Sequence, residues 1–519
     1  MSDHGESEPE PFDAAELRKA LGEGDPAKVR ALLAAGADIR YTRPKGSAAL
    51  INAVHGRDVA RDPRLLDLLT LLVEYGVDLN AVSEYEESGL RVLSRVGRFD
   101  AVRLLLRAGA DVNQLAWTPL IAAVALGTAA DVRAELDRDA DLEEQDWWSR
   151  TAWLVAMLAG DLDKAKLLRE RGADTSARGR CGQPPAFYAI HGRAPATVLR
   201  WLMRVGVDVL QVDDYGTTPL GEAAAADDPD AVATLLAAGA EIDEGEKLFG
   251  TALARASSPA MIRRLLDAGA DPVSLSCYHQ RILIGLPETR GKALAEVSPD
   301  EFWRAPTRYF GGRNPDLLRE PFWEAMIRDG VCAYSARKRF VDGGQLGEPV
   351  WCADRYGQSL TLLPDGRAVQ IAGEHEDSYD PDFCIYNDVF VHEPGGGVAI
   401  YGYPEDVFPP TDFHTATLVG DAIYVIGSLG YHAARRPGET PVYRLDVHTM
   451  RMDRVEVGGD PPGWIFRHRA VVTGPHTIRV WGGEVITGPG APVANTGTFV
   501  LDLTHRIWYR EVTPDEPGA

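Results

Sequence analysis

The chain has 519 residues, more than a single hydrophobic core usually fills, so we expect two or more folded domains. Its composition, with 45% hydrophobic and 25% charged residues, excludes a wholly disordered protein. The formal net charge of −23 disfavours nucleic acid as a partner, because phosphate backbones bind chiefly to Lys and Arg. A basic protein partner fits this charge better, although an acidic surface that only keeps the protein soluble explains it too.

The amino-terminal segment, residues 1–12, is acidic and poor in apolar residues, which predicts a disordered tail rather than a signal peptide. No apolar run reaches the roughly 18 residues of a membrane-spanning helix, so no membrane association is expected. The five cysteines are odd in number and include no C-x-x-C pair, so we interpret them as reduced, buried thiols. These features together predict a cytoplasmic protein.

A recurring Leu-Leu-x-x-Gly-Ala-Asp phrase follows the tail, for example at residues 32–38 and 105–111, with a period near 33 residues. Its glycine suits the left-handed residue that ends a helix. Trp117-Thr118-Pro119-Leu120 and Thr217-Thr218-Pro219-Leu220 suit the start of the next helix, with Thr as the cap and Pro in the first turn. The glycine position falls at Gly36, Gly76, Gly109, Asp139 as a degenerate copy, Gly172, Gly206, Gly239 and Gly269.

The phrase, its period and the Thr-Pro-Leu segments resemble the ankyrin repeat. The resemblance implies a helical solenoid of about eight units over residues 13–275, with residues 13–35 as an atypical amino-terminal cap. It also implies that function lies in the variable positions, since the repeat signature itself serves packing. The equivalent positions of the first helices, which we expect in the core, are Leu50, Leu90, Leu120, Trp153, Phe187, Leu220 and Leu253.

The tips of the hairpins between these units carry large apolar or aromatic side chains at several positions, although hairpin tips point into solvent. Trp and Tyr are frequent anchors of protein interfaces, so these residues are candidate partner contacts, with the adjacent Trp pair ranked first. The alternative is that the Trp rings fold back on the hairpin or pack against the second domain. The extra length at residues 55–64 predicts a tolerated loop. The candidate contacts are Tyr85, Trp147, Trp148, Tyr215 and Leu248.

Residues 276–347 lose the period and predict a helical linker that caps the solenoid and joins it to the following domain. Ser298-Pro299-Asp300-Glu301 is a capping box with Pro at the first helical position, so it predicts the start of one helix. A second helix is expected after Asn314-Pro315.

Residues 348–513 contain short runs of Val, Ile, Tyr and Thr between Gly, Pro and Asp, a pattern typical of strands and turns. Three segments that end in glycine align at 368–373, 423–427 and 478–483, and a second strand-like segment follows each of them. This order, repeated about every 55 residues and closed by Trp508 in the third copy, resembles the kelch repeat. Only the third copy has the full Gly-Gly pair.

The kelch resemblance implies blades of a β-propeller, but closed rings usually have about four to eight blades and only three copies are visible. Residues 330–356 form a degenerate blade, or the solenoid and linker cover the open edges, or two chains associate through them. The expected fold class is therefore multidomain α + β, with an ankyrin solenoid followed by an all-β kelch-like domain as a partial or small propeller. Residues 514–519 form a tail.

An acidic insertion between strands of the first kelch-like copy is the most chemically loaded segment. Its carboxylates and single imidazole suit a divalent metal ion or a general acid or base. Their spacing matches neither H-E-x-x-H nor an EF-hand, so a structural or partner-binding loop is the competing interpretation. His414 and His468, in the other two copies, are expected to make structural hydrogen bonds. The candidate metal ligands are His375, Glu376, Asp377, Asp380 and Asp382.

The sequence contains no P-loop, no dinucleotide-binding glycine pattern, no G-x-S-x-G elbow and no zinc spacing among its cysteines, so no cofactor is predicted. We expect an adaptor or inhibitor that binds a protein partner through the ankyrin hairpin or concave face, without catalysis of its own. The kelch-like domain would supply a second binding surface. The alternative is a metal-dependent or sugar-acting enzyme with its site in the acidic loop, since some sugar-acting enzymes have kelch-like propellers.

Overall fold

The computed structural model describes residues 12–41, 48–55, 58–246, 250–270, 275–286, 291–341, 346–376 and 382–511. The chain forms two compact units, one of residues 1–257 with 264–270 and one of residues 258–263 with 271–519. None of the helices in the described ranges is both long enough and apolar enough to cross a membrane.

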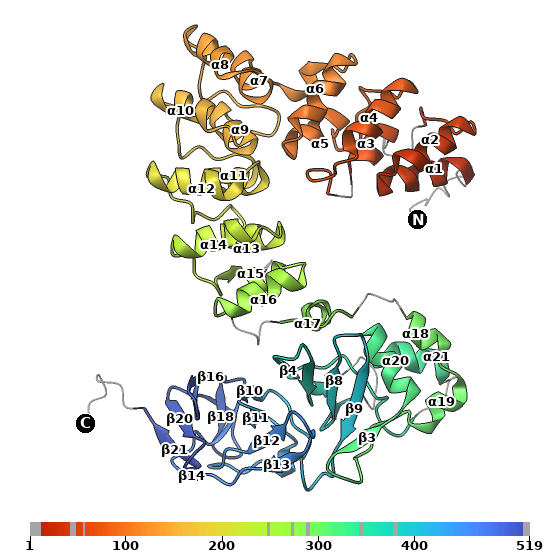
Figure 1. Ribbon diagram of the computed structural model, residues 1–519, viewed down its shortest axis with the longest axis vertical. Helices are drawn as coiled ribbons and strands as arrows, with labels where there is room; N and C mark the ends of the chain where they lie inside the picture. Colours follow the sequence, from red (N-terminus) through yellow and green to blue (C-terminus); the bar gives the residue numbers. More distant parts are fainter. Residues whose placement is uncertain are drawn as a thin grey trace. The chain divides into compact units, whose positions relative to one another are not determined.

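The described residues of the amino-terminal half form eight pairs of short helices that follow one another as a solenoid (Figure 1). Most of the first helices of neighbouring pairs pack on each other, as do several of the second helices. The first helices are α1 (Phe12–Glu23), α3 (Ala49–Val54), α5 (Gly89–Arg95), α7 (Pro119–Leu126), α9 (Ala152–Ala159), α11 (Pro185–His191), α13 (Pro219–Ala225) and α15 (Ala252–Arg255). The second helices are α2 (Pro26–Ala34), α4 (Leu65–Glu74), α6 (Phe99–Arg107), α8 (Ala129–Leu136), α10 (Leu162–Glu170), α12 (Pro195–Arg204), α14 (Pro229–Ala237) and α16 (Pro259–Asp267).

The repeated phrase ends each second helix as predicted. Its glycine is left-handed, with φ of 102° at Gly109, and Asp139 of the degenerate copy adopts φ of 61°. The aspartate of the phrase then starts the turn, because Asp111 accepts a hydrogen bond from the backbone N–H of Asn113 at 2.9 Å. The same contact recurs at the aspartates of five other units, Asp38, Asp78, Asp141, Asp174 and Asp208.

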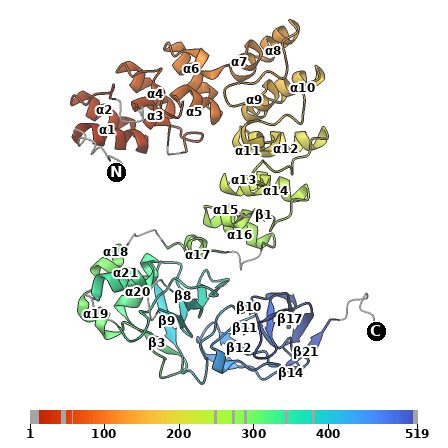
Figure 2. The same ribbon diagram turned by 180° about the vertical axis from the view of Figure 1, so that it is seen from behind.

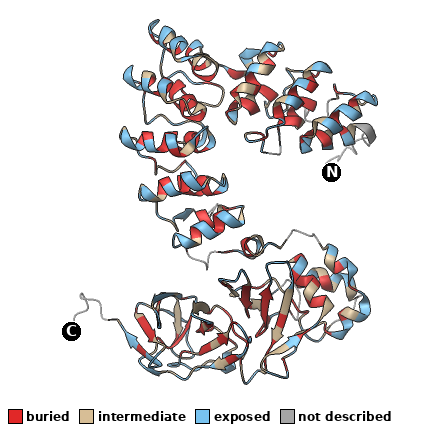
Figure 3. Cartoon of the chain, viewed as in Figure 1, coloured by how far each residue is buried: buried red, intermediate tan, exposed pale blue. Residues whose placement is uncertain are grey.

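The Thr-Pro-Leu segments begin first helices as predicted. The side chains of Thr118 and Thr218 accept hydrogen bonds from the backbone N–H groups of Ile121 and Gly221 at 3.1 and 3.0 Å. All seven apolar positions predicted for the core of the first helices are buried, with at most 2% exposure. Figure 3 shows the resulting pattern, in which the buried side of each helix faces its neighbours and the exposed side faces outward.

The packing of first helices changes between the third and fourth units. α5 packs on α3 and α7 packs on α9, whereas the third and fourth units meet through α6 and α7. The fifth unit also touches the third, since the hairpin before α9 bonds to α5 and a Cβ at Gly97 would lie 3.0 Å from the Leu158 side chain. The fifth unit therefore stabilises the junction between the third and fourth units, where the first helices do not pack on each other.

Five helices between residues 277 and 340 connect the solenoid to the β region and cover its first sheet. They are α17 (Cys277–Leu283), α18 (Lys292–Glu296), α19 (Pro299–Arg304), α20 (Pro321–Asp329) and α21 (Ala333–Phe340). The capping box at Ser298 and Glu301 is present, as predicted. The second helix expected after Asn314-Pro315 is present as α20, but it begins only at Pro321, because the strand β3 (Asp316–Leu318) comes first and pairs with a distant strand.

Three sheets of antiparallel strands dominate the β region (Figures 1 and 2). The first has the order β3-β9-β8-β5-β4, the second β10-β11-β12-β13, and the third β14-β21-β20-β17-β16, in which β14 alone pairs in parallel. Two small sheets, β6-β7 and β15-β18-β19, lie in the loops. The strands are β4 (Ser359–Leu362), β5 (Ala368–Ile371), β6 (Glu374–His375), β7 (Cys384–Ile385), β8 (Val389–His392), β9 (Val398–Gly402), β10 (Thr415–Val419), β11 (Ala422–Ile426), β12 (Val442–Asp446), β13 (Met452–Arg454), β14 (Gly458–Gly459), β15 (Trp464–Phe466), β16 (Arg469–Gly474), β17 (Thr477–Trp481), β18 (Glu484–Ile486), β19 (Val493–Ala494), β20 (Thr498–Asp502) and β21 (Ile507–Arg510).

The three segments that the sequence aligns are β5, β11 and β17, which occupy equivalent places in the three sheets. Apolar side chains pack between the first and second sheets and between the second and third. The other face of the first sheet packs on the linker helices, where Phe390 and Ile400 join Phe302 and Trp323 in one cluster. On the third sheet, Val471 and Tyr509 are 44% and 47% exposed.

Candidate interaction surface and the acidic loop

Within the described residues, the same type of tight turn forms four hairpin tips of the solenoid. These tips are residues 83–87, 146–150, 179–183 and 213–217. In each, the N–H of the first residue donates to the carbonyl of the last, at distances of 2.9 to 3.3 Å. The carboxylates of Asp146 and Asp213 also accept the N–H groups two and four residues on, all at 2.9 Å. Hydrogen bonds therefore fix the backbone that presents the predicted contact residues.

Two of the predicted contacts, Tyr85 and Tyr215, are well exposed, at 72% and 58%. The Tyr215 hydroxyl donates to the sulfur of Cys181 on the neighbouring tip at 3.7 Å, and the N–H of Asp214 donates to the Cys181 carbonyl at 3.0 Å. Cys181 is exposed, so the expectation of buried thiols is wrong at this position, because the residue sits on a hairpin tip. Leu248 lies outside the described residues.

Trp147 and Trp148 are half-buried rather than free in solvent. The Trp148 indole N–H donates to the carbonyl of Arg91 on α5 at 2.9 Å, and the two rings pack edge to face. The guanidinium of Arg91 lies 4.1 Å from the centre of the Trp147 ring, and that of Arg95 lies 5.0 Å from the Trp148 ring. The rings therefore fold back on the chain, and the surface that receives them belongs to the third unit rather than to their own hairpin.

A buried ion pair fixes the same hairpin to α5. Arg150 donates to Asp146 through Nε at 2.9 Å and Nη2 at 2.6 Å, and each side chain is 1% exposed. Arg150 also donates to the carbonyl of Ser94 at 2.9 Å and to its hydroxyl at 2.6 Å. The equivalent residue of the tip at 213–217 is Thr217, which has no group that can reach so far.

Arginines surround the Trp pair, and the sequence pattern did not indicate them as contact residues. The exposed guanidinium of Arg180 lies 5.2 and 5.1 Å from the ring centres of Trp147 and Trp148. We refer to Arg91, Trp147, Trp148, Arg180 and Tyr215 as the tip surface. The sequence indicated Trp147, Trp148 and Tyr215. No local pattern connects them with Arg91 and Arg180, because the five residues come from α5 and from the tips of three different units.

A cavity of about 470 Å³ lies at the opposite ends of the same first helices, where α5, α11 and α13 finish. Its wall includes Asp58 and Arg61 of the extra segment at 55–64. Arg98 donates to the carbonyls of Val59 and Asp62 at 2.9 and 3.0 Å, so the segment is held in place from the third unit.

Glu222, in the cavity wall, is paired with two basic side chains. His191 and Arg255 lie 3.1 and 2.5 Å from its carboxylate oxygens. Burial alone would raise the pKa of Glu222, but these two partners hold it below its ordinary value. The carboxylate is therefore ionised and already paired, which leaves it little capacity to bind a further cation.

Comparison with known proteins identifies part of the solenoid. Residues 152–246 match the family model of ankyrin repeats in three copies. The solenoid contains ankyrin repeats.

Two relatives match part of the chain. An ankyrin repeat domain-containing protein of Stachybotrys chartarum is 26% identical over 220 residues, which are 40% of this chain and 11% of that protein. A homologue of transient receptor potential cation channel subfamily A member 1, from Caenorhabditis elegans, is 25% identical over 188 residues, 36% of this chain and 15% of that protein. The chain thus covers only a small part of either relative.

The acidic loop does not bring its described residues together as a metal site. Asp377 and Asp380 lie outside the described residues. The Nδ1 atom of buried His375 is hydrogen-bonded to the carbonyl of Asp354 at 2.7 Å, Glu376 is exposed, and Asp382 is buried. Within the described ranges, no group of three or more His, Cys, Asp or Glu side chains is placed to hold a metal ion.

A different carboxylate pair lies next to this loop. Burial and the adjacent Asp412 raise the pKa of Glu374 to about 7, and burial also raises the pKa of Asp412. Asp412 is fully buried and accepts hydrogen bonds from the N–H of Gly430 at 2.6 Å and the hydroxyl of Ser428 at 3.3 Å. Burial therefore disfavours the charged form of both carboxyl groups.

His414 and His468 make the structural hydrogen bonds that we expected. The Nε2 atoms of His414 and His468 lie 2.8 Å from the Ser359 hydroxyl and 2.9 Å from the Thr415 hydroxyl. Each bond joins one sheet to the next, and burial lowers the pKa of both imidazoles to about 3, so they are neutral.

Proposed function

We propose that this protein is an adaptor or inhibitor that binds a protein partner through the hairpin face of its ankyrin repeats. The observation that carries the proposal is the exposure of Tyr85 and Tyr215 on hydrogen-bonded hairpin tips. A Tyr on a fixed backbone loses little conformational entropy on binding and offers both an apolar ring and a hydroxyl, so it suits an interface anchor. The outer edges of the Trp147 and Trp148 rings extend the same surface.

The three antiparallel sheets support a second proposal, that the β region is kelch-like and supplies another binding surface. Support comes from the equivalent strand order of the three sheets and from the His to hydroxyl bonds that connect them. Val471 and Tyr509, which are exposed on the third sheet, mark the side where a partner would bury apolar area. We also place the protein in the cytoplasm, where free thiols such as Cys181 and Cys352 stay reduced.

The experiment is to capture partners from a cell extract with the full chain, identify them, and measure their affinity for variants. Tyr85→Ala with Tyr215→Ala should weaken binding by about 30-fold or more, as expected for two hot-spot residues. Tyr75→Ala is the matched control, because Tyr75 is also exposed, at 39%, but ends α4 instead of a hairpin tip. A partner that binds both variants equally well would locate the interface elsewhere.

A further inference from the structure

The tip surface has a local charge that differs from that of the whole chain. The chain carries a formal net charge of −23, which by itself would attract basic partners. Charges more than about 10 Å away are largely screened at physiological salt, so the groups at the contact decide which side chains can bind there. At the tip surface these groups are guanidiniums.

Three guanidiniums, two of the tip surface and one beside it, have no carboxylate as a hydrogen-bond partner within the described residues. Arg91 donates to the carbonyls of Gln114 and Glu86. Arg178, beside the tip at 179–183, donates to the carbonyls of Gly182 and Val212 and to the side-chain oxygen of Gln211. Arg180 forms no ion pair with any described residue and contacts the Trp rings instead. Their positive charges are therefore not neutralised by direct contacts.

The acidic groups nearby do not remove this charge. Asp146 is paired with the buried Arg150, and Asp213 is buried with its carboxylate on backbone N–H groups. Glu87 is paired with Arg95. Glu84, Glu86 and Asp214 are exposed carboxylates on the adjacent tips. Glu86 interacts electrostatically with Arg91, but within the described residues none of the three forms an ion pair with Arg91 or Arg180.

Arg180 lies against the Trp pair and remains exposed. Its guanidinium lies over two indole rings while its edge remains exposed. A planar guanidinium can donate two parallel hydrogen bonds to a carboxylate, and stacking on Trp limits the rotamer entropy that would be lost on binding. The half-buried Trp rings and exposed Tyr215 supply adjoining apolar area for a neighbouring side chain of the ligand.

We propose that the tip surface binds an acidic segment of the partner protein, with a carboxylate on Arg180 and an apolar or aromatic side chain against Trp147, Trp148 and Tyr215. This inference rests on the proposed function and specifies the partner's chemistry at that site. It differs from the basic partner that net charge alone suggests.

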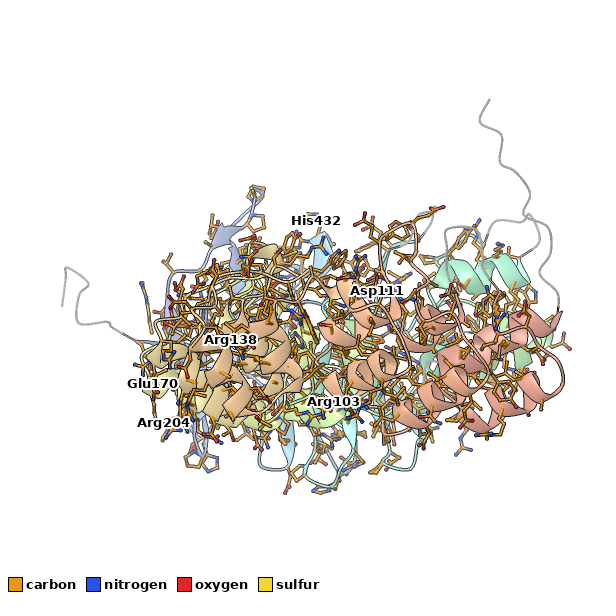
Figure 4. All side chains as sticks on the ribbon, turned by 90° about the horizontal axis from the view of Figure 1, so that it is seen from above. Arg103, Asp111, Arg138, Glu170, Arg204 and His432 are labelled. Atoms are coloured by element: carbon orange, nitrogen blue, oxygen red, sulfur yellow. The ribbon has the colours of Figure 1, made fainter. Side chains whose placement is uncertain are left out.

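The test uses the full chain and a random dodecapeptide display library, followed by calorimetry with the selected peptides. The peptides should be enriched in Asp or Glu next to an aromatic residue. Arg180→Glu should weaken them by about 10-fold or more, and Arg180→Lys by less, because Lys keeps the charge and loses the paired geometry. Arg204→Glu is the matched control, since Arg204 ends α12 of the same repeat unit and lies along one side of the solenoid with Arg138 and Glu170 (Figure 4).

The outcomes separate the two proposals. Peptides that are neutral or basic, or that bind the Arg180→Glu variant as tightly as the native chain, overturn the acidic-segment inference but leave hairpin-face binding intact if Tyr85→Ala or Tyr215→Ala weakens them. Single-stranded RNA that binds at Arg180 while acidic peptides do not also overturns it, in favour of phosphate recognition. Failure of every peptide to bind at any hairpin tip counts against both proposals.

Discussion

Replacing Arg150 by Ala should destabilise the ankyrin solenoid more than any surface substitution, because it leaves the Asp146 carboxylate buried without its cation. Both side chains are 1% exposed, and Arg150 makes two hydrogen bonds to Asp146 and two to Ser94. Removing one partner of a buried ion pair typically costs about 3–5 kcal/mol of unfolding free energy. The contacts to Ser94 join the fifth unit to the third, so the first three units should also lose coupling to the rest.

The assay is urea unfolding of the full chain, followed by far-ultraviolet circular dichroism, which is dominated by the helices of the solenoid. The helical transition should move to lower urea and become broader or biphasic as the two parts of the solenoid unfold separately. Arg138→Ala is the control, because its ion pair with Glu135 is on the surface, with Arg138 68% exposed, and is worth at most about 1 kcal/mol.

A further variant distinguishes charge from shape. Asp146→Asn with Arg150→Met removes both charges and keeps an oxygen that can accept the hydrogen bonds of the turn. This double variant should therefore recover more than half of the unfolding free energy that Arg150→Ala loses. An Arg150→Ala transition that coincides with that of Arg138→Ala would refute the reasoning, since it would mean that the buried pair does not connect the units.

Three other changes test separate features of the structure. Trp147→Ala with Trp148→Ala should lower the unfolding free energy by about 1–3 kcal/mol in urea, because half-buried rings and an indole hydrogen bond are lost. Asp139→Gly should raise it by about 0.5–1 kcal/mol in thermal unfolding, because glycine adopts the left-handed φ of 61° without strain. Glu374→Gln should remove a pH dependence of the stability of the β region. The pKa of Glu374 rises from 4.5 in the unfolded chain to about 7 in the folded one, so the unfolded chain loses this proton first as the pH increases. The unfolding free energy of the native protein should therefore fall as the pH increases between these two values.

Each of these predictions has a control or a contrary result. Unchanged stability of the Trp double variant, with weakened partner binding, would assign the rings to the interface alone. Asp139→Ala keeps a Cβ, so an equal gain with Ala and Gly would contradict the strain argument. Glu376→Gln alters an exposed carboxylate in the same loop and should reduce the pH dependence only in part, because Glu376 raises the pKa of Glu374 less than burial and Asp412 do. A pH dependence that survives in Glu374→Gln would show that other groups titrate.

The repeated features were predictable because each unit encodes the same local contacts. A glycine that ends a helix, such as Gly109, an aspartate that starts a turn, such as Asp111, and a buried residue such as Leu120 all act within one unit or its next neighbour. Their period in the sequence is therefore the period of the structure. The first strands of the β region were predictable for a similar reason, because alternating β-branched residues between turns act within one hairpin.

The missed features all depend on contacts that local pattern does not contain. The hairpins at 146–150 and 213–217 have the same turn, and only the fold shows that Arg150 reaches Ser94 two units away. β3 is too short to recognise and exists because β9 lies beside it. The acidic loop was predicted as a metal site from its composition, but composition does not determine where the side chains point. His375 is hydrogen-bonded to a backbone carbonyl, and the neighbouring Glu374 lies near Asp412, which is distant in the sequence.

The structural role of the Trp pair changes how an interface on the ankyrin repeats has to be identified. Because Trp147 and Trp148 connect the fifth unit to α5, their removal alters the solenoid itself, and lost binding alone would not show that a partner touches the rings. Arg180 gives a cleaner answer. It is exposed and forms no ion pair with the described residues, so exchanging its charge should leave the solenoid intact. A binding change at Arg180 without a stability change therefore reports contact with the partner, and the sign of that change reports the partner's charge.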